Sequence, residues 1–163
     1  MKNIIKSTAL LLCSLAFFTA CDDDRDNNPT IQTPTTFVLN TPSYAQANVD
    51  LATSESLAFS WSQPDYGYPA LASYQIQVSP TNRWTKDIQA GEKDATDQAV
   101  GDYKTFDTEF SLVKGSVAAN EMAKALQEIV RYEPNNVPTS QEVYVRVRSV
   151  YAGDTIYSNA VQI

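Results

Sequence analysis

The sequence contains no histidine, and this absence removes several classes of enzyme. Without an imidazole, the chain lacks the general base of the common serine and cysteine hydrolases. It also lacks the commonest side-chain ligand of transition metals. We therefore expect the 163 residues to form no catalytic site, to hold no metal and to need no cofactor.

Cysteine and basic side chains are also scarce. The chain has two cysteines, Cys13 and Cys21, so a framework of several disulfides is excluded and the fold must depend on packing. Its 12 basic and 19 acidic side chains give a net charge of −7. Nucleic acid is excluded as an expected partner, because phosphate binding needs a basic surface. An acidic surface suits a neutral ligand or simply solubility.

Long hydrophobic runs are absent except near the start of the chain. The run from Ala9 to Ala20 follows Lys2 and Lys6 and is too short to cross a bilayer, which takes roughly 20 apolar residues. A basic start, an apolar run and small residues at its end are typical of a secretory signal. We therefore predict a signal peptide over residues 1–20, directly before Cys21.

The position of Cys21 resembles the lipobox of bacterial lipoproteins, in which this cysteine is lipidated and becomes the first mature residue. Phe18 stands where leucine is commoner. The acidic run from Asp22 to Asp26 resembles the surface-export signal of Bacteroidetes lipoproteins. A calcium loop starting at Asp22 is excluded, because Asn27 and Thr33 occupy the places of its glycine and glutamate. The resemblance implies a lipid-anchored, surface-exposed protein of the outer membrane.

Residues 21–35 are polar and lack the apolar side chains that would order them, so we predict a tether. Residues 36–163 then show short runs of alternating apolar side chains separated by Pro, Gly, Asn and Asp, typical of antiparallel strands. The predicted strands are Thr36–Asn40, Ser56–Trp61, Ser73–Ser79, Glu142–Tyr151 and Thr155–Ile163. We predict a mainly all-β domain, an immunoglobulin or fibronectin III-like antiparallel β-sandwich.

One segment has helical rather than strand periodicity. Val117–Arg131 repeats apolar residues near a spacing of 3.6, contains good helix formers and ends before Pro134. We expect one inserted amphipathic helix that covers an open edge or end of the core. Pro80–Lys104 is polar and predicts a loop, followed by a weak strand within Tyr103–Leu112.

Aromatic side chains are the candidates for glycan binding, because their faces stack on sugar rings. Tyr66 and Tyr68 follow the strand that contains Trp61, and Trp84 lies where the strand pattern ends. Turn chemistry alone explains the tyrosine segment, with both rings folded over the end of the sandwich. Trp84 is better explained by packing at the core or an edge. Trp61 alternates with Phe59 and is assigned to the core.

Carboxylates are plentiful, and a pair of them is what a glycoside hydrolase requires. The candidates are Asp87, Asp94, Asp97, Asp102, Asp107 and Glu109. No conventional motif joins them, so we interpret them as a solvated surface. Asp154-Thr155-Ile156 resembles the O-glycosylation motif of Bacteroidetes surface proteins, a pattern short enough to occur by chance.

The order of the motifs resembles the N-terminal domain of SusE-type lipoproteins from starch utilisation systems. The motifs are Phe37-Val-Leu-Asn-Thr-Pro42, Leu57-Ala-Phe-Ser-Trp61, Tyr74-Gln-Ile-Gln-Val-Ser79, the helix, Val143-Tyr-Val-Arg-Val-Arg148 and Tyr157-Ser-Asn159. The resemblance implies an outer-membrane lipoprotein that works beside a TonB-dependent transporter and a companion glycan-binding lipoprotein. In the family, carbohydrate-binding modules follow this domain, and no counterpart of them occurs before Ile163. The chain is either a truncated member or a stalk in its own right.

Three functions are compatible with these observations. The leading hypothesis is a non-catalytic stalk or docking module in the binding and uptake of starch or another polysaccharide. The alternative is an independent adhesion or scaffold lipoprotein that binds a protein through a sheet edge. A small glycoside hydrolase is the third, opposed by the missing motifs.

Overall fold

The computed structural model describes residue 30 and residues 32–163 of the chain. The predicted signal, Cys21 and most of the tether lie outside the described residues. Ile31–Ile163 form one compact unit. In the part of the chain that the structure describes, no helix has the length and apolar character needed to cross a membrane.

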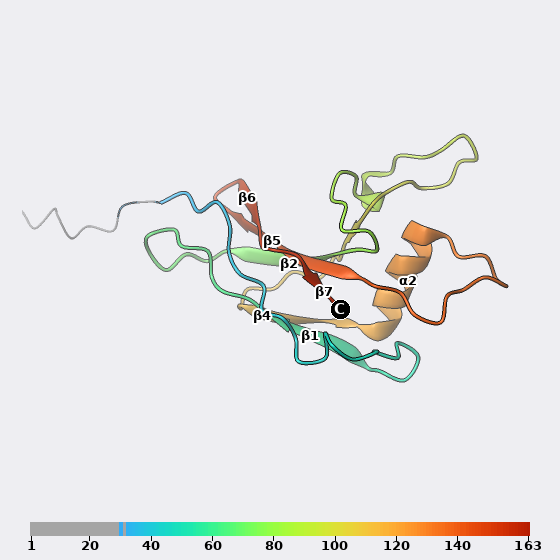
Figure 1. Cartoon of the computed structure of the whole chain (residues 1–163). Coiled ribbons are helices and arrows are strands. Elements are labelled where there is room, and N and C mark those ends of the chain that lie inside the picture. Colours follow the sequence, from blue (N-terminus) through green and yellow to red (C-terminus); the bar gives the residue numbers. More distant parts are fainter. Residues whose placement is uncertain (1–29, 31) are drawn as a thin grey trace, which may run out of the picture. The chain divides into compact units, whose positions relative to one another are not determined.

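The unit contains two antiparallel sheets, which confirms the predicted sandwich class (Figure 1). The smaller sheet pairs β1 (Ser56–Ser60) with β4 (Lys114–Ala118). The larger is five-stranded and runs in the order β3-β2-β5-β6, with β7 also paired to β5. Its strands are β2 (Ser73–Ser79), β3 (Lys104–Thr105), β5 (Tyr144–Tyr151), β6 (Asp154–Tyr157) and β7 (Val161–Gln162).

The core forms from the inner faces of both sheets. Val143, just before β5, and Val145, Val147 and Ser149 within it are buried and alternate with half-buried residues, as the period-2 pattern predicted. Trp61 is 3% exposed and lies with its ring centroid 5.5 Å from that of Tyr74 and 6.0 Å from that of Phe110. Its assignment to the core is confirmed.

The helix α2 (Ala119–Val130) connects the two sheets and lies at one end of them (Figure 1). Ala119, Met122, Ala125 and Leu126 face the core and are buried. The prediction that the helix begins at Val117 is wrong by two residues, because Val117 is the partner of Leu57 in the smaller sheet. Sequence patterning missed β4, which contains a glycine and begins with an exposed lysine.

Three predicted strands are shorter or more divided than the sequence indicated. Thr36–Asn40 makes isolated bridges, in which Phe37 pairs with Ser158 and Leu39 with Trp61. The last strand divides into β6 and β7 around Asn159, whose side-chain amide bonds both the N–H and the C=O of Leu39 at 2.8 and 3.2 Å. The weak strand of Tyr103–Leu112 is reduced to β3 and a bridge between Phe110 and Tyr74.

The segment between β2 and β3 is mostly irregular, as predicted. It contains one short 3-10 helix, η2 (Ile88–Ala90), capped by the carboxylate of Asp87, which accepts from the N–H of Gln89 at 3.0 Å. Ile88 is buried and its N–H donates to the C=O of Tyr103 at 2.9 Å. These contacts hold the segment against β3.

Candidate functional site

Tyr66 and Tyr68 fold against the end of β5. Tyr66 is 5% exposed, and its ring centroid lies 4.7 Å from that of Tyr151. The Tyr68 hydroxyl is hydrogen-bonded to the Tyr151 hydroxyl at 2.7 Å, which raises the pKa of Tyr68. Asp65 closes the turn by accepting from the N–H of Gly67 at 2.9 Å. Tyr66 is therefore buried, and the turn interpretation accounts for both tyrosines.

Trp84 lies half-buried at the outer face of the larger sheet. Its indole N–H donates to the side-chain oxygen of Asn82 at 2.9 Å, and its ring centroid is 5.7 Å from that of Tyr103. The guanidinium of Arg146 lies 4.3 Å from the centre of the indole. Trp84 therefore packs on Arg146 and Tyr103 at the outer face of the larger sheet while keeping part of its surface in solvent.

Arg146 is the centre of a cluster that the sequence did not reveal. Its guanidinium carbon lies 4.0 Å from the centre of the Tyr157 ring and 5.4 Å from that of Tyr103, so cation–π attraction holds it in place. We call Trp84, Tyr103, Arg146, Arg148 and Tyr157 the arginine–aromatic cluster. The signal in the sequence was the pair of arginines at outward positions of β5, but their aromatic neighbours come from other segments.

A chain of hydrogen bonds lies beneath this cluster. Arg146 Nε donates to Gln77 Oε1 at 2.7 Å, and Gln77 Nε2 donates to Thr105 Oγ1 at 2.8 Å. The Thr105 hydroxyl in turn donates to Asp87. Gln77 is 2% exposed, so its amide is fixed by burial as well as by its partners. Partial burial lowers the pKa of Arg146, although a guanidinium remains charged at neutral pH.

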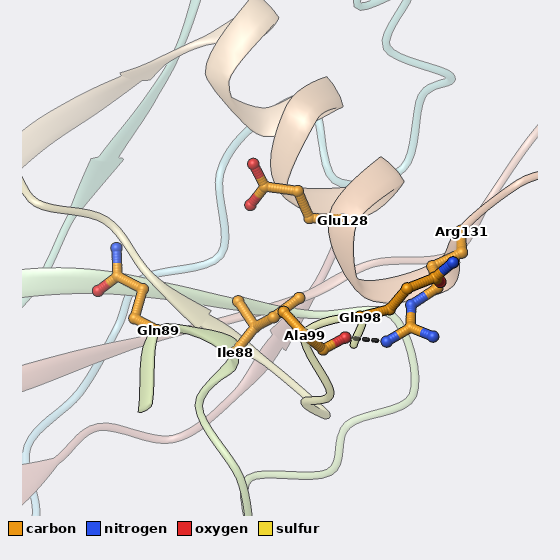
Figure 2. Close-up of a pocket in the computed structure, with 6 residues that line it drawn as sticks. All are labelled: Ile88, Gln89, Gln98, Ala99, Glu128 and Arg131. Carbon is orange, nitrogen blue, oxygen red and sulfur yellow. Dashed lines mark hydrogen bonds between the residues drawn. The ribbon is translucent and has the colours of Figure 1, made fainter. Parts of the chain in front are cut away.

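A second feature is a cavity of about 360 Å³ between the irregular segment and the end of α2 (Figure 2). It is lined by Ile88, Gln89, Gln98, Ala99, Glu128 and Arg131. Arg131 ends the helix with a φ of 59°, and its guanidinium donates to Asp94 at 2.7 Å and to the carbonyl of Ala99. The cavity is thus closed on one side by a structural ion pair.

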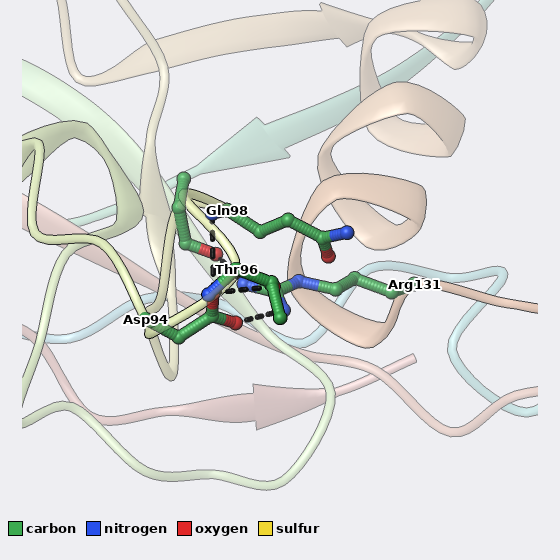
Figure 3. Close-up of polar contacts among 5 residues, drawn as sticks. Asp94, Thr96, Gln98 and Arg131 are labelled. Atoms are coloured by element: carbon green, nitrogen blue, oxygen red, sulfur yellow. Dashed lines mark hydrogen bonds and ion pairs between the residues drawn. The ribbon is translucent and has the colours of Figure 1, made fainter.

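Asp94 organises the loop beside this cavity (Figure 3). Its carboxylate accepts from the Thr96 hydroxyl at 2.6 Å, from the N–H of Thr96 at 2.8 Å and from the N–H of Gln98 at 3.1 Å. The Thr96 hydroxyl, followed by Arg131, holds the pKa of Asp94 well below its usual range. These bonds make Asp94 a fixed anion that organises the loop.

Four of the other candidate carboxylates have comparable local partners. Asp97 pairs with Lys93 at 2.8 Å, Asp107 accepts from Gln89 at 2.9 Å, and Glu109 accepts from Ser73 at 3.1 Å. Asp87 caps η2, whereas Asp102 is held through its backbone, whose N–H donates to the C=O of Lys86 at 2.8 Å. Within residues 32–163, no group of three or more acidic side chains or cysteines has the geometry of a metal site.

A larger hollow of about 1130 Å³ lies along α2. Residues 45–52 and 137–143 form its sides, and Met122, Leu126 and Ile163 contribute apolar surface. Its lining combines polar and apolar surface and does not indicate a particular class of ligand.

Comparison with known protein families assigns the chain to one of them. Residues 23–148 match the family model described as SusE outer membrane protein. The chain belongs to the SusE family. The match begins within the predicted tether and ends in β5, so it includes both β1 and β4, the helix and most of the larger sheet. The SusE family consists of outer membrane proteins of the starch utilisation type, and the resemblance drawn from the motifs is confirmed.

Proposed function

We propose that this SusE-family protein is a lipid-anchored, surface-exposed stalk or docking module that serves polysaccharide binding and uptake without catalysing a reaction. The observation that carries the proposal is the family match over residues 23–148, which includes most of the sandwich. It is supported by the local partners of Asp94, Asp97, Asp107 and Glu109, whose carboxylates are engaged in hydrogen bonds and ion pairs within the fold.

Lipidation of Cys21 is the anchoring step. Each buried methylene contributes about 0.8 kcal/mol, so two or more acyl chains hold a protein stably at a bilayer. In cells fed an alkyne fatty acid, Cys21→Ala should abolish labelling of the protein and its recovery in the outer membrane. Cys13→Ala is the matched control and should leave both unchanged, because Cys13 lies within the predicted signal. Undiminished labelling of Cys21→Ala would contradict the anchor.

Docking is tested on the complete outer-membrane assembly. The resemblance implies a TonB-dependent transporter and a companion glycan-binding lipoprotein as partners, and starch or another polysaccharide as the material taken up. An affinity-tagged protein should recover the transporter from mild detergent, and deletion of the gene should slow growth on the glycan but not on glucose. Recovery of surface fibres without a transporter would favour the adhesion or scaffold alternative.

Direct starch binding should be weak in this domain. A stalk supports other modules that bind the glycan and does not bind it strongly itself. The purified protein should therefore migrate through a starch-containing native gel with almost unchanged mobility. A dissociation constant near 1 μM, which corresponds to about −8 kcal/mol, would show that this domain is itself a starch-binding module. Release of reducing sugars by the purified protein would contradict the non-catalytic role.

A further inference from the structure

The outward face of β5 bears two cations in an otherwise acidic protein. Tyr144, Arg146, Arg148 and Val150 alternate with the buried core residues and are half-buried. The arginines are two residues apart on one face, which places their Cα atoms about 6.6 Å apart. Both belong to a chain with a net charge of −7. The outward face of β5 therefore carries a small patch of positive charge on a protein that is negatively charged as a whole.

Neither arginine is neutralised by a carboxylate in the described part of the chain. The ion pairs between residues 32 and 163 use Lys86, Lys93, Lys104 and Arg131 as the cations. Arg146 and Arg148 instead bond neutral amides, Gln77 Oε1 at 2.7 Å and Gln75 Oε1 at 3.1 Å. An amide orients a guanidinium without cancelling its charge, so both cations retain their attraction for an anion.

The neighbouring aromatic rings hold Arg146 and extend the surface. Arg146 lies over Trp84 and Tyr157, and its Nε is occupied by Gln77, which leaves its two terminal amino groups with no hydrogen bond to another described residue. Tyr157 lies in β6 opposite Arg148 and is 37% exposed. The adjacent strands β5 and β6 therefore present a partly open aromatic ring beside two oriented guanidinium groups.

We propose that the arginine–aromatic cluster binds a carboxylate-bearing polysaccharide, of the uronic acid class. Guanidinium groups recognise carboxylates by paired, charge-assisted hydrogen bonds, and an aromatic ring stacks on the apolar face of a pyranose. Each sugar unit of a polyuronate has both a carboxylate and a pyranose ring with an apolar face. This inference rests on the proposed role in polysaccharide uptake and specifies the chemistry of the glycan that this domain contacts.

One feature favours a polyuronate over an acidic peptide. The cluster combines partly open aromatic surface with the cations, and an aspartate- or glutamate-rich peptide would use only the cations. The excess of acidic groups elsewhere in the protein repels both of these polyanions. Binding must therefore depend on Arg146 and Arg148 and on a ring that the ligand can stack against.

The test is affinity electrophoresis of the detergent-solubilised full-length protein through gels that contain polygalacturonate, neutral starch or polyglutamate. Polygalacturonate should retard the protein, and starch and polyglutamate should not. Arg148→Gln and Tyr157→Ser should each weaken the retardation by about tenfold or more, which corresponds to about 1.4 kcal/mol. Lys124→Gln is the charge-matched control, because Lys124 is exposed on α2, and should bind like the unmodified protein. Circular dichroism establishes that each variant is folded.

Several outcomes would overturn the inference. Equal retardation by polyglutamate would assign the cluster to acidic peptides, and retention of binding in a folded Arg148→Gln variant would exclude the cluster. Absence of any retardation by polygalacturonate would also refute it. That last result leaves the proposed function intact if Cys21-dependent anchoring, recovery of the transporter and the growth defect are observed.

Discussion

Gly115, in the smaller sheet, leaves room for the ring of Phe110. It pairs with Phe59 in the ladder between β1 and β4, and the Phe110 ring occupies the space where a side chain would stand. A Cβ at this position would lie 2.6 Å from a carbon of that ring. Because Phe110 also packs on Trp61, it has little freedom to withdraw.

Gly115→Ala should destabilise the protein by about 1–3 kcal/mol, because overpacking displaces the Phe110 ring. The measurement is urea unfolding followed by circular dichroism. Ser116→Ala is the control in the same strand, since Ser116 is exposed, and it should change stability little. Equal stability of the two variants would mean that the ring moves without cost.

Asp94 gives the irregular segment a dependence on pH. The Thr96 hydroxyl and Arg131 hold its pKa below the value of about 3.9 found in unfolded chains. A group whose pKa is lower in the folded state stabilises that state above the unfolded pKa. Its contribution is lost as the pH falls from about 3.9 through the folded value.

Thr96→Val should raise the pKa of the Asp94 carboxyl toward 3.9, since it removes the largest contribution to the shift. NMR titration of the carboxyl carbon measures this directly. Thr108→Val alters an exposed threonine elsewhere and should leave the Asp94 titration unchanged. A midpoint that is the same in both variants would assign the shift to Arg131 and the backbone amides.

At the scale of elements, α2 closes one end of the core. Its four buried residues lie on one face, and its first residue donates its N–H to the C=O of Glu55 at 3.0 Å, just before β1. No side chain caps its first turn. Its stability therefore depends on packing more than on local capping.

Met122→Ala should cost about 2–5 kcal/mol, because Met122 is 1% exposed and its removal leaves a cavity against the core. Thermal or urea unfolding measures the loss. Lys124→Ala lies on the exposed face of the same helix and should be neutral or slightly stabilising, since alanine is the better helix former. A small loss at Met122 would indicate that the open hollow along α2 collapses to fill the space.

At the scale of the whole molecule, Ile31–Ile163 form one compact unit, while the predicted domain begins at residue 36. Gln32 donates its N–H to the C=O of Tyr66 at 2.9 Å, and the Thr36 hydroxyl donates to the C=O of Tyr157 at 3.1 Å. The start of the unit is thus attached to both the Tyr66 turn and β6.

Proteins that begin at residue 31 or at residue 36 should both unfold in a single cooperative transition. The shorter one should be less stable by about 1 kcal/mol, the usual net value of a hydrogen bond. Tryptophan fluorescence and circular dichroism should report coincident midpoints. Separate transitions would indicate that the two sheets do not form one cooperative core.

The strands that could be predicted were those with an unbroken alternation of apolar side chains. Ser73–Ser79 was predicted to the residue, and Trp61 was placed in the core, since burial of one sheet face imposes a period of two. β4 could not be found in this way, because Gly115 leaves its packing to Phe110 from another segment. The division around Asn159 was equally hidden, because its partner Leu39 lies 120 residues away.

The sequence alone determined the class of fold, the family and the prediction of a lipid-anchored, non-catalytic protein, because these depend on local periodicity, on the order of motifs and on which residue types are missing. Only the tertiary structure decided which aromatic side chains are accessible. It buried Tyr66 against Tyr151 and gathered Trp84, Tyr103 and Tyr157 around Arg146 from three separate segments. A surface cluster of this kind depends on the register between strands, which no stretch of sequence specifies by itself.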